Sequence, residues 1–271
     1  MKGRFIMKKK VLVLLLAVAM LAALAACGDT GSNNSESPSE SVKQSESLSP
    51  SENESPSESE TPTEPEKEET AYEITYNNAR IYTDSIGTPW VQVIVEIENT
   101  GSADLYLSSG KCDLEDKDGN LVKSLSMVSI FPSVIAAGEK AYLYEETTLD
   151  EAVEGEITAL PRFSADKATV DNVRFNVTDA EITGDQFGFM KGKGRVENTT
   201  SEAEDGMTYI VFVLKDAEST PIGVMFTIMT DTLNPGDKFG FEVSGMSLPD
   251  DVTPDTVASF DTYAYPYQLQ F

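Results

Sequence analysis

Four short segments in the part of the chain from Ala71 onward recur, in the same order, about 100 residues further along. An internal repeat of this length indicates two copies of one folding unit. It divides the folded part into residues 71–168 and 169–271. The paired segments are 78–81 with 179–182, 95–100 with 194–199, 112–116 with 212–216, and 135–140 with 233–238.

Each copy has the residue pattern of β-strands. In residues 90–98 every second residue is a valine or isoleucine, which predicts a strand with one apolar face. Residues 208–216 are apolar on both faces, as in the central strand of a sheet. Turn residues such as Asp118-Gly119-Asn120 separate these segments, and long amphipathic helices are missing. The sequence therefore predicts an all-β fold of two tandem antiparallel sandwich domains.

The segment Phe-Val-Leu-Lys-Asp at 212–216, with the Val-Glu-Asn-Thr turn before it and Asn-Pro-Gly-Asp-Lys after it, resembles the FxLYD domain. The resemblance implies two small immunoglobulin-like β-sandwiches of a kind found in bacterial extracytoplasmic proteins. Both copies depart from the motif, because Lys215 and Glu115 replace its tyrosine and Cys112 replaces its phenylalanine. The family brings no catalytic residues.

The N-terminus has the features of an export signal. A basic segment precedes an apolar run at 11–26, which at 1.5 Å per residue spans roughly 24 Å and is short for a membrane-spanning helix. Leu24-Ala25-Ala26-Cys27 resembles the lipobox of bacterial lipoproteins. The resemblance implies that residues 1–26 are removed and that Cys27 carries a diacylglycerol, whose two acyl chains suffice for membrane anchoring. The alternative is an ordinary secretory signal followed by a chance cysteine.

Residues 27–70 are rich in serine, glutamate and proline and contain no aromatic residue. Such a segment cannot bury enough apolar surface to offset its ordering entropy, so we expect a disordered acidic tether. The expected location is the extracytoplasmic face of the cell membrane, at the surface of a Gram-positive cell.

The charge balance excludes several functions. The chain has 20 basic and 46 acidic residues, a net charge of −26, two cysteines and no histidine. A histidine-dependent nucleophile or a His-ligated metal is therefore impossible, and two cysteines cannot form a four-cysteine metal site. So acidic a chain is not expected to bind nucleic acid. We expect no cofactor and no metal.

Two features of the first repeat have alternative interpretations. Cys112 alternates with Leu114, so we expect a buried packing thiol rather than a nucleophile. Asp116, Asp118 and Asn120 have the first spacings of a calcium loop, but the glycine and the last ligand are out of place. We expect a hairpin turn there, with a weak calcium site as the alternative.

Two features of the second repeat suggest contacts with a partner. Lys191, Lys193 and Arg195 would share one face of a strand, where they could hold an anionic partner or instead pair with acidic residues on neighbouring strands; we favour pairing. The aromatic and apolar residues at 263, 265, 267, 269 and 271 also alternate. Exposed, they would suit a glycan or peptide; we expect them instead to form the core face of the last strand, with Pro266 indicating an edge position.

These observations predict a non-catalytic, membrane-anchored surface lipoprotein that acts as a binding module in the bacterial cell envelope. Its partners would be the membrane, through Cys27, and an envelope protein or wall polymer. A structural spacer or accessory subunit of an envelope complex is the main alternative, and an enzyme using a carboxylate pair is a weaker one.

Overall fold

The computed structural model describes residues 68–185, 189–245 and 248–270. Within these ranges the chain forms β-strands paired in antiparallel fashion and no helix, which confirms the predicted all-β, sandwich-like class. Accordingly, no described segment is a helix long and apolar enough to cross a membrane. The predicted leader, Cys27 and nearly all of the predicted tether lie outside the described residues.

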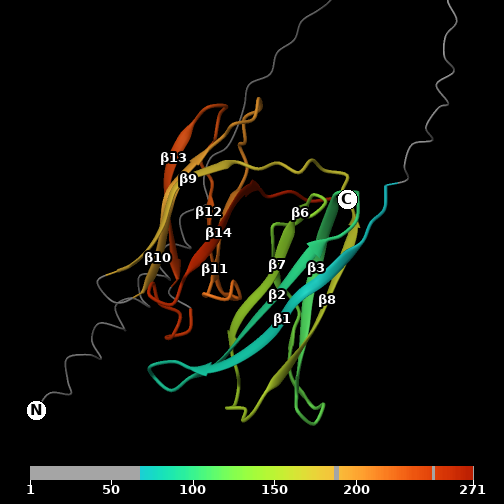
Figure 1. The fold of residues 1–271 in the computed structure, drawn as a ribbon, viewed down its shortest axis with the longest axis vertical. Helices are drawn as coiled ribbons and strands as arrows, with labels where there is room; N and C mark the ends of the chain where they lie inside the picture. The colour runs from blue at the N-terminus through green and yellow to red at the C-terminus, as the bar shows by residue number, and fades with distance from the viewer. Residues whose placement is uncertain (1–67, 186–188, 246–247, 271) are drawn as a thin grey trace, which may run out of the picture. The chain divides into compact units, whose positions relative to one another are not determined.

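The first half, residues 68–168, contains strands β1 to β8 (Figure 1). Their order in the sheet is β4-β3-β8-β1-β2-β7-β5, with β6 paired to β3. The sheet folds over on itself, because β8 and β1 are joined through the pair Ala79–Ile157. The strands are β1 (Tyr72–Thr83), β2 (Pro89–Asn99), β3 (Leu105–Asp116), β4 (Leu121–Leu125), β5 (Ser129–Phe131), β6 (Val134–Ile135), β7 (Lys140–Thr148) and β8 (Ile157–Lys167).

The second half, residues 169–270, contains two three-stranded sheets with the orders β13-β10-β9 and β12-β11-β14. The same orders occur in the first half, as β7-β2-β1 and β4-β3-β8. As predicted, residues 208–216 supply a central strand, β11, and the strand that contains Pro266 lies at a sheet edge. The strands are β9 (Asn176–Gly184), β10 (Met190–Glu197), β11 (Thr208–Lys215), β12 (Pro221–Met229), β13 (Lys238–Gly245) and β14 (Ser259–Pro266).

Each half has its own apolar core between its layers. In the first half the valines of β2 are fully buried among side chains of β3, β7 and β8. In the second half Gly192 and Gly194 of β10 replace two of these valines. A Cβ atom on Gly192 would lie 3.1 Å from the ring of Phe212, and one on Gly194 would lie 2.8 Å from the ring of Phe241. Aromatic rings therefore fill the space that the glycines leave.

A buried asparagine closes the same loop in each half. The Nδ2 of Asn99 donates to the carbonyls of Ala103 and Ile135, at 2.9 and 3.1 Å. The Nδ2 of Asn198 donates to the carbonyls of Glu202 and Leu233, both at 2.7 Å. These bonds hold backbone carbonyls on both sides of the loop that leads into β7 and into β13, and thereby fix the loop.

Alternation correctly identified the apolar face of β2, but the opposite face is buried as well. Gln92, Ile94 and Glu96 are less than a tenth exposed. The carboxylate of Glu96 accepts hydrogen bonds from Thr75 at 2.7 Å, from Tyr142 at 2.9 Å and from Lys140. Burial alone would raise the pKa of Glu96, but these donors outweigh it and hold the pKa below its ordinary value.

Candidate binding groove between the halves

A third apolar cluster joins the two halves, and it explains why the outer face of β2 is covered. From the first half it takes side chains of β2, β5 and β7, and from the second half side chains of β11, β12 and β14. The face of β11 that carries Val211 and Val213 points into this cluster, while its other face points into the core of the second half. The cluster consists of Ile94, Phe131, Tyr142, Tyr144, Val211, Val213, Val224 and Tyr265.

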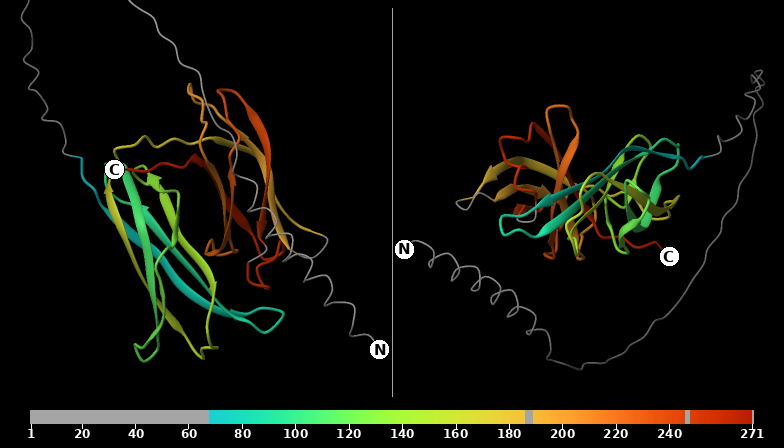
Figure 2. Two further views of the ribbon diagram at one scale, coloured as in Figure 1. Left: turned by 180° about the vertical axis from the view of Figure 1, so that it is seen from behind. Right: turned by 90° about the horizontal axis from the view of Figure 1, so that it is seen from below.

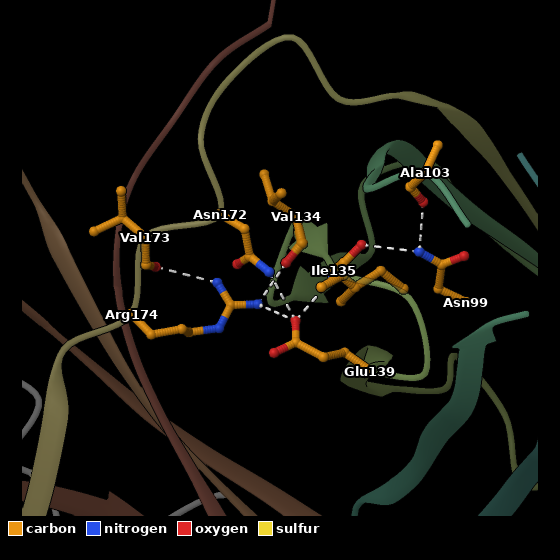
Figure 3. Close-up of polar contacts among 9 residues, drawn as sticks. Asn99, Ala103, Val134, Ile135, Glu139, Asn172, Val173 and Arg174 are labelled. Carbon is orange, nitrogen blue, oxygen red and sulfur yellow. Dashed lines mark hydrogen bonds and ion pairs between the residues drawn. The ribbon is translucent and has the colours of Figure 1, made fainter. Parts of the chain in front are cut away.

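Arg174, in the segment between β8 and β9, forms the polar part of the same junction (Figure 3). Its Nη2 atom donates to the carbonyl oxygen of Val134 at 2.6 Å and to the carboxylate of Glu139 at 3.1 Å. The guanidinium group also lies 5.7 Å from the ring centre of Tyr265. Arg174 thus contacts a loop of the first half and a strand of the second.

The Oε2 atom of Glu139 collects several donors at this point. It accepts from the backbone N–H of Ala136 at 2.9 Å and from Asn172 Nδ2 at 2.9 Å, besides Arg174. Partial burial would raise the pKa of Glu139, but the donors and the positive charge outweigh it, and the pKa lies below its ordinary value. Asn99 holds the other side of the same loop through Ile135. The loop is therefore fixed from both sides.

Beside the apolar cluster lies a groove of about 440 Å³. One wall comes from β3, β5 and the residues around them in the first half. The other comes from β11, β12, β14 and the C-terminal residues 267–269. The last described residues run alongside the first half (Figure 2), where Gln270 donates to the carbonyl of Lys167 and accepts from the N–H of Thr169. The groove is thus assembled from both halves.

Aromatic rings form the wall contributed by the second half. Tyr209 lies at the centre, with its ring 5.8 Å from those of both Tyr265 and Tyr267 and 6.4 Å from that of Phe226. Phe131 of β5 completes the group, 4.8 Å from Phe226. Tyr265 and Phe131 are buried, whereas Phe226 is 41% and Tyr267 is 46% exposed. The cluster thus has a buried base and an exposed edge.

Four serines line the wall contributed by the first half, together with apolar and aromatic side chains such as Leu107 and Ile130. Ser108, Ser129 and Ser133 are half-buried, and Ser109 has a left-handed backbone with φ of 57°. The next residue must be glycine, because a Cβ on Gly110 would meet the carbonyl oxygen of Val128 at 2.3 Å. This irregularity interrupts the pairing of β3 with β8 and brings the segment before β5 against β3.

Among the described residues, those that line the groove include no charged side chain. Burial and the neighbouring Tyr267 raise the pKa of Tyr209 above its ordinary value. Burial also raises the pKa of Tyr265. Both phenols are therefore neutral at physiological pH. An uncharged surface is unusual in a chain with a net charge of −26.

The alternating residues of β14 lie in an apolar core, as predicted, but in the one between the halves rather than the one inside the second half. Tyr263 and Tyr265 point into the cluster between the halves, whereas Phe260 and Ala264 face the core of the second half. Tyr267 and Leu269 follow β14 and are about half exposed in the groove. The strand alternates as predicted, and apolar clusters cover both of its faces. Residue 271 lies outside the described residues.

The basic residues of β10 each face a carboxylate on a neighbouring strand. Lys191 pairs with Glu242 of β13, Lys193 pairs with Glu181 of β9, and Arg195 lies 3.7 Å from Asp179 of β9. This is the cross-strand pairing that the sequence favoured. The three residues lie on β10, away from the groove lining. Their use by an anionic partner stays an untested prediction.

The other residues singled out in the first half have structural surroundings. Cys112 is fully buried, and burial raises the pKa of its thiol to about 11, so it is protonated at neutral pH. The Oδ1 of Asp116 accepts from the N–H groups of Asp118 and Asn120, both at 2.9 Å, as in a hairpin turn. In the described ranges no group of three or more acidic or sulfur side chains is arranged to hold a metal ion.

Sequence reasoning missed most of the groove. The alternation of residues 263–271 is the one sequence signal for it. Tyr209 is predicted only as part of a strand, and no sequence prediction covers Phe226. The serines of the first wall carry no sequence signal, because they meet the aromatic residues only through the tertiary fold. Neither a family model nor a curated protein matches the chain.

Proposed function

We propose that the chain is a non-catalytic lipoprotein, anchored through Cys27, with two FxLYD-like domains that bind a component of the bacterial cell envelope in the groove between them. The observation that carries this proposal is the aromatic, uncharged lining of that groove. Concave sites lined by aromatic side chains with a few polar groups are typical of ligand binding, and about 440 Å³ lies within the usual range of roughly 300–1,000 Å³.

The surroundings of the groove support a binding role. Its base is anchored by buried Phe131 and Tyr265, and Arg174 ties the two walls together. A site with such support is preorganised, so a ligand need not supply the free energy to order it.

A structural spacer is the second candidate. The shared apolar cluster and the contacts of Arg174 favour it, because they hold the halves in contact as a spacer would require. A spacer role does not explain why aromatic rings are exposed at one end of that cluster. The exposure of Phe226 and Tyr267 therefore favours a binding role.

A carboxylate-pair enzyme has less support. Burial and the charge of Glu146 raise the pKa of Glu145, as expected for a general acid. The two residues are adjacent in β7, however, so their side chains point to opposite faces and cannot flank one substrate bond. Glu146 moreover accepts hydrogen bonds from Tyr82 and Tyr144.

The proposal can be tested by site-specific photo-crosslinking of the full chain in living cells. A photoreactive benzoylphenylalanine replaces Tyr267 in the groove or Tyr72, which is equally exposed at 46% but lies on β1 outside the groove lining. We expect an envelope adduct from position 267 and none from position 72. Adducts from both positions, or from neither, would contradict a ligand held in the groove.

A further inference from the structure

We infer that the groove binds an uncharged polysaccharide chain, an inference that rests on the proposed function and specifies its ligand. The first argument is electrostatic. The chain as a whole is strongly acidic, so an anionic polymer would be repelled. A cationic ligand would find no carboxylate in the groove lining, and the tyrosines there are neutral. The lining is therefore matched to a neutral ligand.

The second argument is the way in which the aromatic rings are presented. Phe226 and Tyr267 lie at the open side of the groove rather than in a deep pocket, and both are more than two-fifths exposed. A sugar ring has a flat face of C–H groups with positive partial charge, which can stack on the negative face of an aromatic ring. Adjacent rings around Tyr209, 5.8 and 6.4 Å from it, offer successive stacking positions along a chain of sugars.

The third argument is the opposite wall. Within the part of the chain that the structure describes, no protein group bonds the hydroxyl groups of Ser108, Ser129 and Ser133 that line the groove. Each hydroxyl can donate and accept, as can the amide of Gln268 nearby. These groups match the hydroxyls at the edge of a sugar ring, so the aromatic wall would contact its face while the serine wall bonds its edge.

A peptide fits the groove less well. Extended peptides commonly bind by adding a strand to free backbone groups. At the serine wall the N–H of Leu107 already donates to the carbonyl of Ser133 at 2.7 Å, and the N–H of Val128 donates to that of Gly110 at 2.9 Å. These backbone groups are occupied within the wall itself, so side chains rather than the backbone must recognise the ligand.

The inference is tested by calorimetric titration of the full chain, purified in mild detergent, with soluble oligosaccharides. The probes are cellohexaose and chitohexaose, which are neutral, and a galacturonic acid hexamer, which is an anionic chain of similar size. We expect a neutral hexasaccharide to bind and the anionic one not to bind. Tyr267→Ala should weaken binding about three- to tenfold, because it removes one stacking ring. Tyr267→Phe should retain binding, and Tyr72→Ala should leave it unchanged.

The possible outcomes separate the two proposals. If the crosslink at position 267 forms in cells but neither neutral hexasaccharide binds, the polysaccharide inference fails and the proposed function stands. Equal binding of the anionic hexamer, or equal losses from Tyr267→Ala and Tyr72→Ala, would also overturn the inference. If crosslink and sugar binding are both absent, both proposals fail. A melting curve of each variant verifies that its fold is intact.

Discussion

At the scale of single residues, the two cores divide the same space differently. Val93 of β2 and Gly192 of β10 occupy equivalent positions in the two halves, as their cross-strand partners Glu145 and Val243 show. Cys112 of β3 and Phe212 of β11 are likewise equivalent. The first half thus has a larger side chain on β2 and a smaller one on β3. The second half has the reverse, with the ring of Phe212 filling the space over Gly192.

This exchange predicts that Gly192→Val destabilises the protein by overpacking, by about 1–3 kcal/mol. Combining it with Phe212→Cys should cost less than the sum of the two single changes, because the smaller residue leaves the space that the valine needs. Urea denaturation of the full chain measures both effects. Gly240→Val is the matched control, since the nearest atom to its Cβ is 3.9 Å away. Equal destabilisation by Gly192→Val and Gly240→Val would refute the packing argument.

At the scale of elements, the loop between β6 and β7 and the segment between β8 and β9 depend on one ion pair. Arg174→Ala removes one of the donors to Glu139, the side-chain donor to the Val134 carbonyl and the cation above the Tyr265 ring. We expect a loss of about 1–3 kcal/mol in the free energy of unfolding. Arg162→Ala removes a more exposed pair with Asp113 and should cost at most about 1 kcal/mol. Similar losses from both variants would show that Arg174 does not hold the junction.

The same ion pair gives the junction a pH dependence. Because the pKa of Glu139 is lower in the folded protein than its ordinary value of 4.5, ionisation favours the folded state. The contribution of Glu139 is therefore present above about pH 4.5 and is lost as the pH falls through the folded-state pKa. Unfolding measured against pH should lose part of its acid dependence in Glu139→Gln. An unchanged acid limb would contradict this role.

At the scale of the whole molecule, the sequence predicts what is local and leaves open what depends on the meeting of the halves. Alternation correctly placed the valines of β2 and the thiol of Cys112 inside a core, because a strand's period fixes which residues share a face. It could not show that Ile94 on the other face is buried, since Ile94 packs against strands more than 100 residues away. Tyr265 is buried as predicted, but the core that covers it lies between the halves, which the sequence could not show for the same reason.

The proposed membrane anchor rests on sequence alone, and two cysteines allow a matched test. If Cys27 carries the lipid, radiolabelled palmitate fed to cells should appear in the native protein and should be absent from Cys27→Ala. The variant should also either leave the membrane fraction or keep its leader. Cys112→Ala should keep the label, because that thiol is fully buried and protonated and cannot reach an acyl donor. Mass spectrometry should find Cys27 as the first residue of the mature chain. An amino terminus at Met1, or label remaining in Cys27→Ala, would contradict membrane anchoring through Cys27.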